Sequence, residues 1–260
     1  MTGAALAERL MSLRGRRALV TGASRGIGRS IATLFAKAGA DVAIQYHVRA
    51  DLAAEVVEAI AATGRSGLAI QADLSGPGAG RDLAQRCVRE FGPVDILVLN
   101  AAEQRRQPIE AVGADTYDLQ ADTGFRSSFE LVQALLPSMR GRGFGRVIAI
   151  GSVQQLRPNA QLTVYAAMKA ALANLMRNLA KLSGPHGVTC NTILPGLIDT
   201  DRSLEVRADA AAYASLIERI PCRREGRVDE VAALALFLAG PSGGYVNGAD
   251  YLLDGGLSLP

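Results

Sequence analysis

The stretch Thr21-Gly22-Ala23-Ser24-Arg25-Gly26-Ile27-Gly28 decides the fold that this sequence predicts. The apolar run Ala18–Val20 leads into it, and a helical pattern with apolar residues on one face leads out. Glycines let the backbone approach a ligand closely, and free N–H groups at a helix start bind anions. The stretch therefore predicts a strand, a phosphate-binding turn and a helix, as a variant of the Gly-x-Gly-x-x-Gly fingerprint. A purely structural glycine turn fits the same residues, so the rest of the chain has to decide.

Short apolar runs alternate with helical patterns along the chain. The expected strands are Ala18–Thr21, Val42–Tyr46, Leu68–Ala72, Ile96–Leu99, Val147–Ile150, Val188–Leu194 and Tyr251–Leu253. The expected helices are Gly26–Ala38, Asp51–Thr63, Arg81–Phe91, Asp115–Arg140, Val164–Leu182 and Asp229–Leu238. This alternation predicts an α/β fold, a Rossmann-type, doubly wound and mostly parallel sheet of seven strands with helices on both faces.

The chain shows no linker that would divide it. We therefore expect one dinucleotide-binding domain over residues 1–260. The segment Asp199–Arg227 lacks a strand pattern, and in a doubly wound sheet its position favours a substrate lid over the ligand crevice. A solvated helical excursion explains the same segment equally well.

Composition limits the classes of partner. The net charge is +3, from 28 basic and 25 acidic residues that are not gathered into runs, so no nucleic acid is predicted. Residues 1–15 lack a long apolar core, which predicts no signal peptide, no membrane span and a cytoplasmic location. The three cysteines, Cys87, Cys190 and Cys222, are widely separated, so neither a metal site nor a redox pair is expected.

Polar or glycine residues follow most of the expected strands. They are Tyr46-His47-Val48-Arg49, Asp73-Leu74, Asn100-Ala101-Ala102, Gly151-Ser152, Pro195-Gly196 and Thr200. In open parallel sheets, ligands bind beyond the carboxyl ends of the strands. These residues are therefore candidates for a nucleotide site.

The residues after the second strand favour NADP(H) over NAD(H). An acidic residue usually holds the ribose 2′-hydroxyl at this place, but here Tyr46 stands with His47 and Arg49 beside it. Arg25 lies within the glycine turn. No carboxylate repels a 2′-phosphate there, and two guanidinium groups can attract one. Alternatively, His47 and Arg49 only cap or solvate the next helix.

A second signal is Tyr165-x3-Lys169. Positions i and i+4 of a helix share a face, so the lysine ammonium would favour the phenolate of the tyrosine. Such a tyrosine can exchange a proton with a substrate oxygen near neutral pH. Ser152, at the end of a strand, can hold the same oxygen. Alone, this spacing usually means a surface pair.

Together these residues resemble the short-chain dehydrogenase/reductase family over nearly the whole chain, including Val246-Asn247-Gly248 and Asp254-Gly255-Gly256 near the end. The resemblance implies Tyr165 as general acid/base, Lys169 as the group that lowers its pKa and holds the nicotinamide ribose, and Ser152 as the group that polarises the substrate carbonyl. It also implies a homodimer or homotetramer. The cofactor-binding residues it implies are Gly22, Ser24, Arg25, Gly26, Ile27, Gly28, Tyr46, His47, Arg49, Asp73, Leu74, Asn100, Ala101, Tyr165, Lys169, Pro195, Gly196, Ile198 and Thr200.

Two places depart from the family pattern. The family's Asn-Asn-Ala-Gly reads Leu99-Asn100-Ala101-Ala102, and Gly124 stands where the family has a helix asparagine that braces a proton-relay water. We therefore expect an altered or slower proton relay. The alternative is a protein that binds the cofactor as a sensor, with weak catalysis or none.

The loop Glu103–Pro108 resembles that of the gluconate 5-dehydrogenase branch, and the chain also resembles 3-oxoacyl-(acyl carrier protein) reductases. Arg105 or Arg106 is a candidate partner for a substrate carboxylate, and a polar pocket is indicated by Gln154, Gln155 and Asn159. These residues favour a small polar substrate, a sugar acid or polyol. A solvated surface loop is the alternative.

A rival interpretation starts from Gly22-Ala23-Ser24-Arg25-Gly26, which fits the Gly-x-Ser-x-Gly elbow of α/β serine hydrolases. It would make Ser24 a nucleophile. The elbow would follow the first strand rather than lie mid-sheet, no His-Gly-Gly-type segment is present, and the chain has only two histidines. It is the remote alternative.

Overall fold

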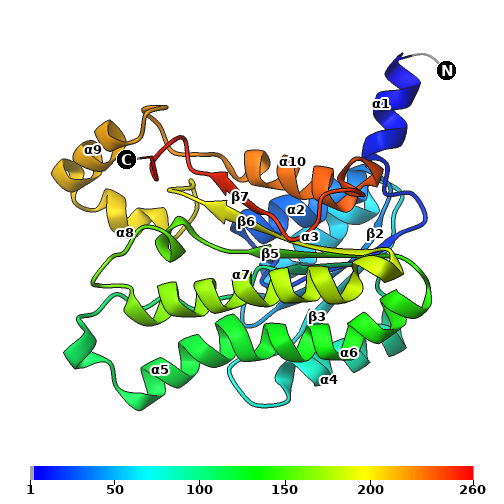
Figure 1. Ribbon diagram of the computed structural model, residues 1–260, viewed down its shortest axis with the longest axis horizontal. Coiled ribbons are helices and arrows are strands. Elements are labelled where there is room, and N and C mark those ends of the chain that lie inside the picture. Colours follow the sequence, from blue (N-terminus) through cyan, green and yellow to red (C-terminus); the bar gives the residue numbers. More distant parts are fainter. Residues whose placement is uncertain (1–2, 260) are drawn as a thin grey trace.

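The computed structural model, which describes residues 3–259, confirms the α/β fold (Figure 1). The strands form one seven-stranded parallel sheet in the order β3-β2-β1-β4-β5-β6-β7. Their bounds are β1 Arg17–Val20, β2 Asp41–Tyr46, β3 Gly67–Gln71, β4 Ile96–Leu99, β5 Gly145–Ile150, β6 Val188–Pro195 and β7 Asp250–Leu253. Each lies within two residues of the expected strand.

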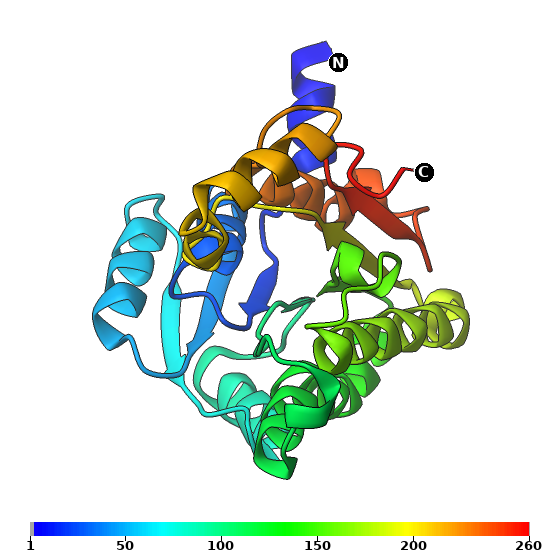
Figure 2. The same ribbon diagram turned by 90° about the vertical axis from the view of Figure 1, so that its left-hand side faces the viewer.

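Helices cover both faces of this sheet (Figure 2). The α-helices are α1 Gly3–Met11, α2 Gly26–Lys37, α3 Ala50–Ala61, α4 Ala79–Phe91, α5 Ala114–Ala121, α6 Ser127–Gly141, α7 Thr163–Ser183, α8 Ser203–Arg207, α9 Ala210–Arg219 and α10 Val228–Ala239. The shorter turns are η1 Ile109–Ala111, η2 Asp122–Arg126, η3 Val153–Gln155, η4 Gly184–His186 and η5 Pro241–Gly243. One apolar core lies under α2, α3 and α10, and the other lies under α4, α6 and α7.

Burial explains why the strands read as continuous apolar runs. Every residue of β4, β5 and β6 is buried, as a strand covered by helices on both faces requires. On α2, Ile31 and Phe35 are fully buried against the sheet, at the spacing that the sequence predicts. The apolar pattern thus fixes which side of each helix faces the strands.

The strand order places a ligand crevice at the carboxyl ends of the central strands. The order reverses between β1 and β4, and ligands of doubly wound sheets bind where this reversal occurs. Val20 pairs with Val98, so the residues that follow these two strands emerge side by side. The glycine turn and Asn100 therefore meet at the crevice.

The expected helix Asp115–Arg140 is interrupted. Between α5 and α6 the chain forms one π-helical turn, η2, with Gly124 at its centre. The hydroxyl of Ser127 donates to the carbonyl of Thr123 at 2.9 Å, and that of Ser128 donates to the carbonyl of Gly124 at 3.4 Å. A glycine weakens the α-helix here, and the two serines satisfy carbonyls that the wider turn leaves free. The sequence pattern predicts helix on both sides but not this interruption.

Residues 199–227 contain α8 and α9, which lie at the end of the sheet where the strands terminate (Figure 1). Within residues 3–259, no helix is both long and apolar enough to cross a membrane.

Candidate active site

The glycine turn has the geometry of an anion cradle. Gly22 and Gly26 have φ values of +62° and +58°, which favour glycine, and a Cβ at Gly28 would lie 2.5 Å from the carbonyl oxygen of Gly22. Among residues 3–259, no side chain caps the start of α2, so its first N–H groups can bind an anion. These residues fit the phosphates of a dinucleotide.

Two amide side chains hold the turn in place. Gly22 N–H donates to Gln45 Oε1 at 2.8 Å, and Gln45 Nε2 donates to the carbonyl of Ala72 at 2.7 Å. Asn100 Nδ2 donates to the carbonyls of Thr21 and Gly22 at 2.9 and 3.0 Å. Asn100 was expected, but sequence reasoning missed Gln45, whose only signal is an amide inside an apolar strand.

The residues expected at the adenine end follow β2 and β3. Tyr46 ends β2, and the next residue, His47, lies 3.5 Å from the carboxylate of Asp73 (Nε2 to Oδ2). Hydrogen bonds from Ser75, together with His47, hold the pKa of Asp73 below its usual range. Leu74 is buried in the core beneath. Asp73 is thus an ionised, oriented acceptor just beyond the end of β3.

The two arginines expected to attract a 2′-phosphate already have carboxylate partners. Arg25 pairs with Asp201, which lies before α8, at 2.9 Å. Arg49 makes two hydrogen bonds to Asp51, at 2.9 and 2.5 Å. All four side chains are more than half exposed, so solvent screens both pairs. A phosphate at this place has to compete with two aspartates.

A cavity of about 760 Å³ lies at the carboxyl ends of the central strands. It brings together about half of the predicted site: Ile27, Asn100, Ser152, Tyr165, Lys169, Pro195, Gly196, Ile198 and Thr200. The predicted residues outside it lie at or beyond the ends of β1, β2, β3 and β4 or at the start of α2: Gly22, Ser24, Arg25, Gly28, Tyr46, His47, Arg49, Asp73, Leu74 and Ala101. Gly26 lines a smaller cavity of about 430 Å³ between α2 and α8.

Tyr165, Lys169 and Ser152 share the larger cavity. Tyr165 and Lys169 lie one turn apart on α7, with the Lys169 ammonium 5.6 Å from the centre of the Tyr165 ring. Lys169 Nζ donates to the carbonyl of Ile150 at 2.6 Å, which fixes its position. Ser152 caps η3, and its hydroxyl accepts a hydrogen bond from the backbone N–H of Gln154 at 3.2 Å. Because the Ser152 oxygen accepts this hydrogen bond, its hydroxyl proton remains free to donate to a ligand oxygen.

Lys169 is almost completely buried, and its surroundings disfavour the charged form. Burial, followed by the nearby charge of Arg202, lowers the pKa of Lys169 to about 7. Arg202 itself donates to the carbonyl of Ala102. Arg202 was not expected from the sequence, because it lies directly before the short helix α8 and carries no motif.

The two arginines of the loop after β4 lie in different surroundings. Arg106 lines the cavity, whereas Arg105 lies outside it, 3.5 Å from the carboxylate of Glu103. Of the two candidate partners for a substrate carboxylate, only Arg106 therefore lies in the cavity. Gln154 and Asn159 also line the cavity, but Gln155 does not, because its Oε1 turns toward the N–H of Ser152 at 3.5 Å.

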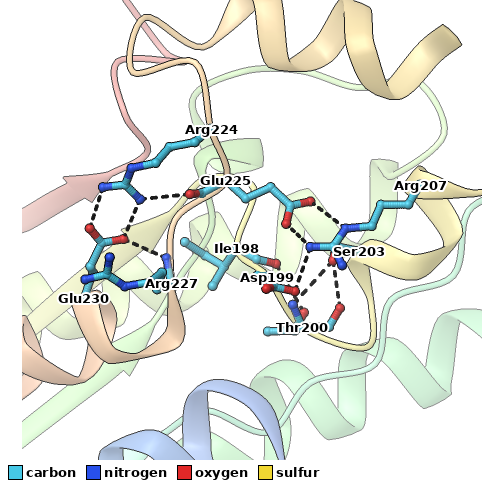
Figure 3. A network of polar contacts seen from close by, with 9 residues as sticks. All are labelled: Ile198, Asp199, Thr200, Ser203, Arg207, Arg224, Glu225, Arg227 and Glu230. Carbon is cyan, nitrogen blue, oxygen red and sulfur yellow. Dashed lines mark hydrogen bonds and ion pairs between the residues drawn. The ribbon is translucent and has the colours of Figure 1, made fainter. Parts of the chain in front are cut away.

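Ion pairs join residues 199–227 to one another and to the start of α10 (Figure 3). Arg207 of α8 lies between Asp199, at 2.7 Å, and the almost buried carboxylate of Glu225. Arg224 forms two hydrogen bonds to Glu230, at 2.9 and 2.6 Å. The contacts of Arg207 hold α8 beside the cavity, where the preceding residues Thr200 and Arg202 contribute to the wall.

Comparisons with known proteins agree with this geometry. The family described as enoyl-(acyl carrier protein) reductase matches residues 22–258. The chain is 37% identical to L-rhamnose 1-dehydrogenase (NAD(P)(+)) of Azotobacter vinelandii, over 95% of this chain and 98% of the relative. It is 34% identical to gluconate 5-dehydrogenase of Gluconobacter oxydans, over 96% and 97%. The structure of a 3-oxoacyl-(acyl-carrier-protein) reductase from Agrobacterium tumefaciens with NADP bound superposes with a TM-score of 0.90 at 39% identity, covering 95% and 96% of the two chains.

The chain belongs to the short-chain dehydrogenase/reductase family. It is therefore an oxidoreductase of the class that acts on CH–OH groups, and a Rossmann-type dinucleotide site is part of its fold. The remote hydrolase interpretation is wrong for this short-chain dehydrogenase/reductase. Among residues 3–259, neither histidine contacts Ser24, since His47 lies beside Asp73 and His186 contacts Arg140.

Proposed function

We propose that the protein is an NADP(H)-dependent oxidoreductase of a small polar substrate, a sugar acid or polyol, with Tyr165 as general acid/base. The observation that carries the proposal is one cavity that holds Tyr165, Lys169 and Ser152 together with Arg106. The relatives named gluconate 5-dehydrogenase and L-rhamnose 1-dehydrogenase support a sugar-derived substrate. The guanidinium of Arg106 is the candidate partner for a carboxylate.

The chain supplies the proton chemistry in this proposal. When NADP(H) is bound, it supplies or accepts the hydride. During reduction, Tyr165 donates its hydroxyl proton to the substrate oxygen, and Ser152 donates a hydrogen bond to the same oxygen. The Lys169 ammonium stabilises the resulting phenolate, because an adjacent positive charge favours the ionised form. During oxidation the same groups act in reverse.

The proposed cofactor site extends from the glycine turn to the base of the lid. The N–H groups at the start of α2 would hold the phosphates, and Asp73 would lie by the adenine. The uncharged Tyr46, with His47, Arg49 and Arg25 nearby, supports NADP(H) over NAD(H), and the Agrobacterium relative has NADP bound. Residues 199–227 would act as a substrate lid on the single domain 1–260.

We also propose a homodimer or homotetramer. Leu252 on the edge strand β7, Tyr245 before it and Phe129 on α6 expose large apolar side chains, which a second copy would cover. Light scattering coupled to size exclusion tests this directly, and a monomer at micromolar concentration would contradict it. A cytoplasmic location and the absence of a nucleic-acid partner stay predictions from the sequence.

A fluorescence titration tests the proposed function. Purified protein is titrated with NADPH and with NADH, and keto-sugar acids and simple ketones are then added while nicotinamide fluorescence is followed. We expect tighter binding of NADPH and its oxidation by a keto-sugar acid. Binding without turnover of any carbonyl would instead support the sensor function that Gly124 suggests. Failure to bind either nucleotide would overturn the proposal.

A further inference from the structure

The cavity holds more positive charge than a substrate with a single carboxylate would neutralise. Four arginines line it: Arg106, Arg157, Arg202 and Arg219. They come from three segments: Arg106 from the loop after β4, Arg157 from the turn after η3, and Arg202 and Arg219 from the start and middle of residues 199–227. One carboxylate, that of Asp209, lies among the described residues that line the cavity.

The surroundings of these arginines show which charges remain for a ligand. Arg202 donates to the carbonyl of Ala102 and acts on Lys169, so it belongs to the cofactor side of the cavity. Arg157 donates to the carbonyl of Leu257 at 2.6 Å, a neutral partner that leaves its charge uncompensated. Within residues 3–259, the side chains of Arg106 and Arg219 have neither an ion pair nor a hydrogen bond. Three guanidinium groups therefore face the substrate region.

Asp209 offsets at most one of these charges. Its Oδ1 already accepts the backbone N–H groups of Ala211 and Ala212, at 3.1 and 3.0 Å, as the N-cap of α9. Three arginines against one aspartate leave two uncompensated positive charges. Like charges that share a small cavity repel one another, and an anion relieves that repulsion as it binds.

We propose that the substrate carries two acidic groups, as an aldaric acid or a phosphorylated aldonic acid does. This rests on the proposed function and names its substrate class more closely. One acidic group pairs with Arg106, and the second pairs with Arg219 and Arg157 on the α9 side of the cavity. Guanidinium groups bind carboxylates and phosphates in the same paired geometry, so both kinds of second group fit.

Ligands with no, one or two acidic groups test the proposal by their binding affinity, without any need for turnover. The protein saturated with NADPH is titrated with galactose, gluconate, galactarate and 6-phosphogluconate, with nicotinamide fluorescence as the readout. We expect galactarate, 6-phosphogluconate or both to bind about tenfold or more tightly than gluconate at low salt, and the difference to shrink at high salt. A preference for galactarate or for 6-phosphogluconate identifies the second group as carboxylate or phosphate. Equal or weaker binding of both dianions than of gluconate, or no binding of any probe, would overturn the proposal.

Two variants locate the second group. Arg219→Gln should bring the dianions down to the affinity of gluconate while leaving gluconate binding nearly unchanged. Because Arg219 is exposed and unpaired, its replacement should not disturb folding. Arg223→Gln is the matched control, since Arg223 lies four residues further along the chain, outside the cavity, and should change nothing. If both variants behave alike, Arg219 does not bind the substrate. Loss of NADPH binding in the wild-type protein would instead contradict the proposed function itself.

Discussion

Arginines at the cofactor end of the proposed site are paired with carboxylates, whereas two arginines at its substrate end are not. At the end near the glycine turn, Arg25, Arg29 and Arg49 each pair with a carboxylate, those of Asp201, Glu55 and Asp51. At the substrate end, Arg106 and Arg219 have no such partner within residues 3–259. The protein thus balances charge where the cofactor's outer phosphate is expected, and leaves it unbalanced where the substrate is expected.

This difference has a consequence for selectivity. A ligand at the substrate end gains the full attraction of the unpaired guanidinium groups. A 2′-phosphate at the cofactor end gains only the difference between its own pairing and that of the aspartate it displaces. We therefore expect a strong requirement for charge in the substrate and a graded preference for NADP(H).

The largest effect on activity should come from replacing Tyr165, which lies between the cofactor end and the substrate end. Tyr165→Phe removes the hydroxyl that exchanges the proton, and we expect turnover to fall by about 10²- to 10⁴-fold. The ring stays packed on α7, so the affinity for NADPH should change little. Steady-state rates and NADPH titration measure the two quantities separately. Retention of most of the activity would contradict the proposed acid/base role.

A smaller effect is expected at the cofactor end. Arg25→Ala combined with Arg49→Ala should weaken NADPH binding by about tenfold, because charge-assisted hydrogen bonds to the 2′-phosphate are lost. NADH, which lacks that phosphate, should bind nearly as before. Parallel fluorescence titrations check the ratio. If both nucleotides weaken equally, the basis for preferring NADP(H) disappears.

Local spacing made much of the fold predictable and indicated part of the candidate site. The glycine turn and the pair Tyr165 and Lys169 are read from residues within one or two helical turns of each other. The apolar runs predict all seven strands because a strand buried on both faces allows little else.

Contacts between distant segments could not be predicted in this way. Arg25 and Asp201 are 176 positions apart, and their pairing depends on how residues 199–207 lie beside α2. Gln45 reaches the glycine turn only because β2 lies beside β1. The arginines of the cavity come from three segments that are far apart in the sequence, and only the loop after β4 pointed to a charged partner from its residues alone.

Asp201 offers a way to sharpen the comparison. Asp201→Asn keeps the size of the side chain but removes the charge that competes for Arg25. An exposed ion pair contributes at most about 1 kcal/mol, so NADPH affinity should rise by about two- to fivefold, with NADH affinity unchanged. Titration of Asp201→Asn against both nucleotides measures this. In the double variant with Arg25→Ala the gain should vanish, and a gain that persists there would show that Asp201 acts by another route.

The smallest effect is a shift in pH dependence at Lys169, the lysine that joins the two ends. Burial and then Arg202 hold its pKa at about 7, so Arg202→Gln should raise that pKa by removing a like charge. Reduction needs the ammonium form, which stabilises the Tyr165 phenolate, so the rate falls as pH rises through the pKa of Lys169. The high-pH limb of kcat should therefore move upward by about 0.5 unit in Arg202→Gln. Arg202→Lys keeps the charge and should leave the limb in place. A downward shift, or the same shift in both variants, would mean that the charge of Arg202 does not act on Lys169.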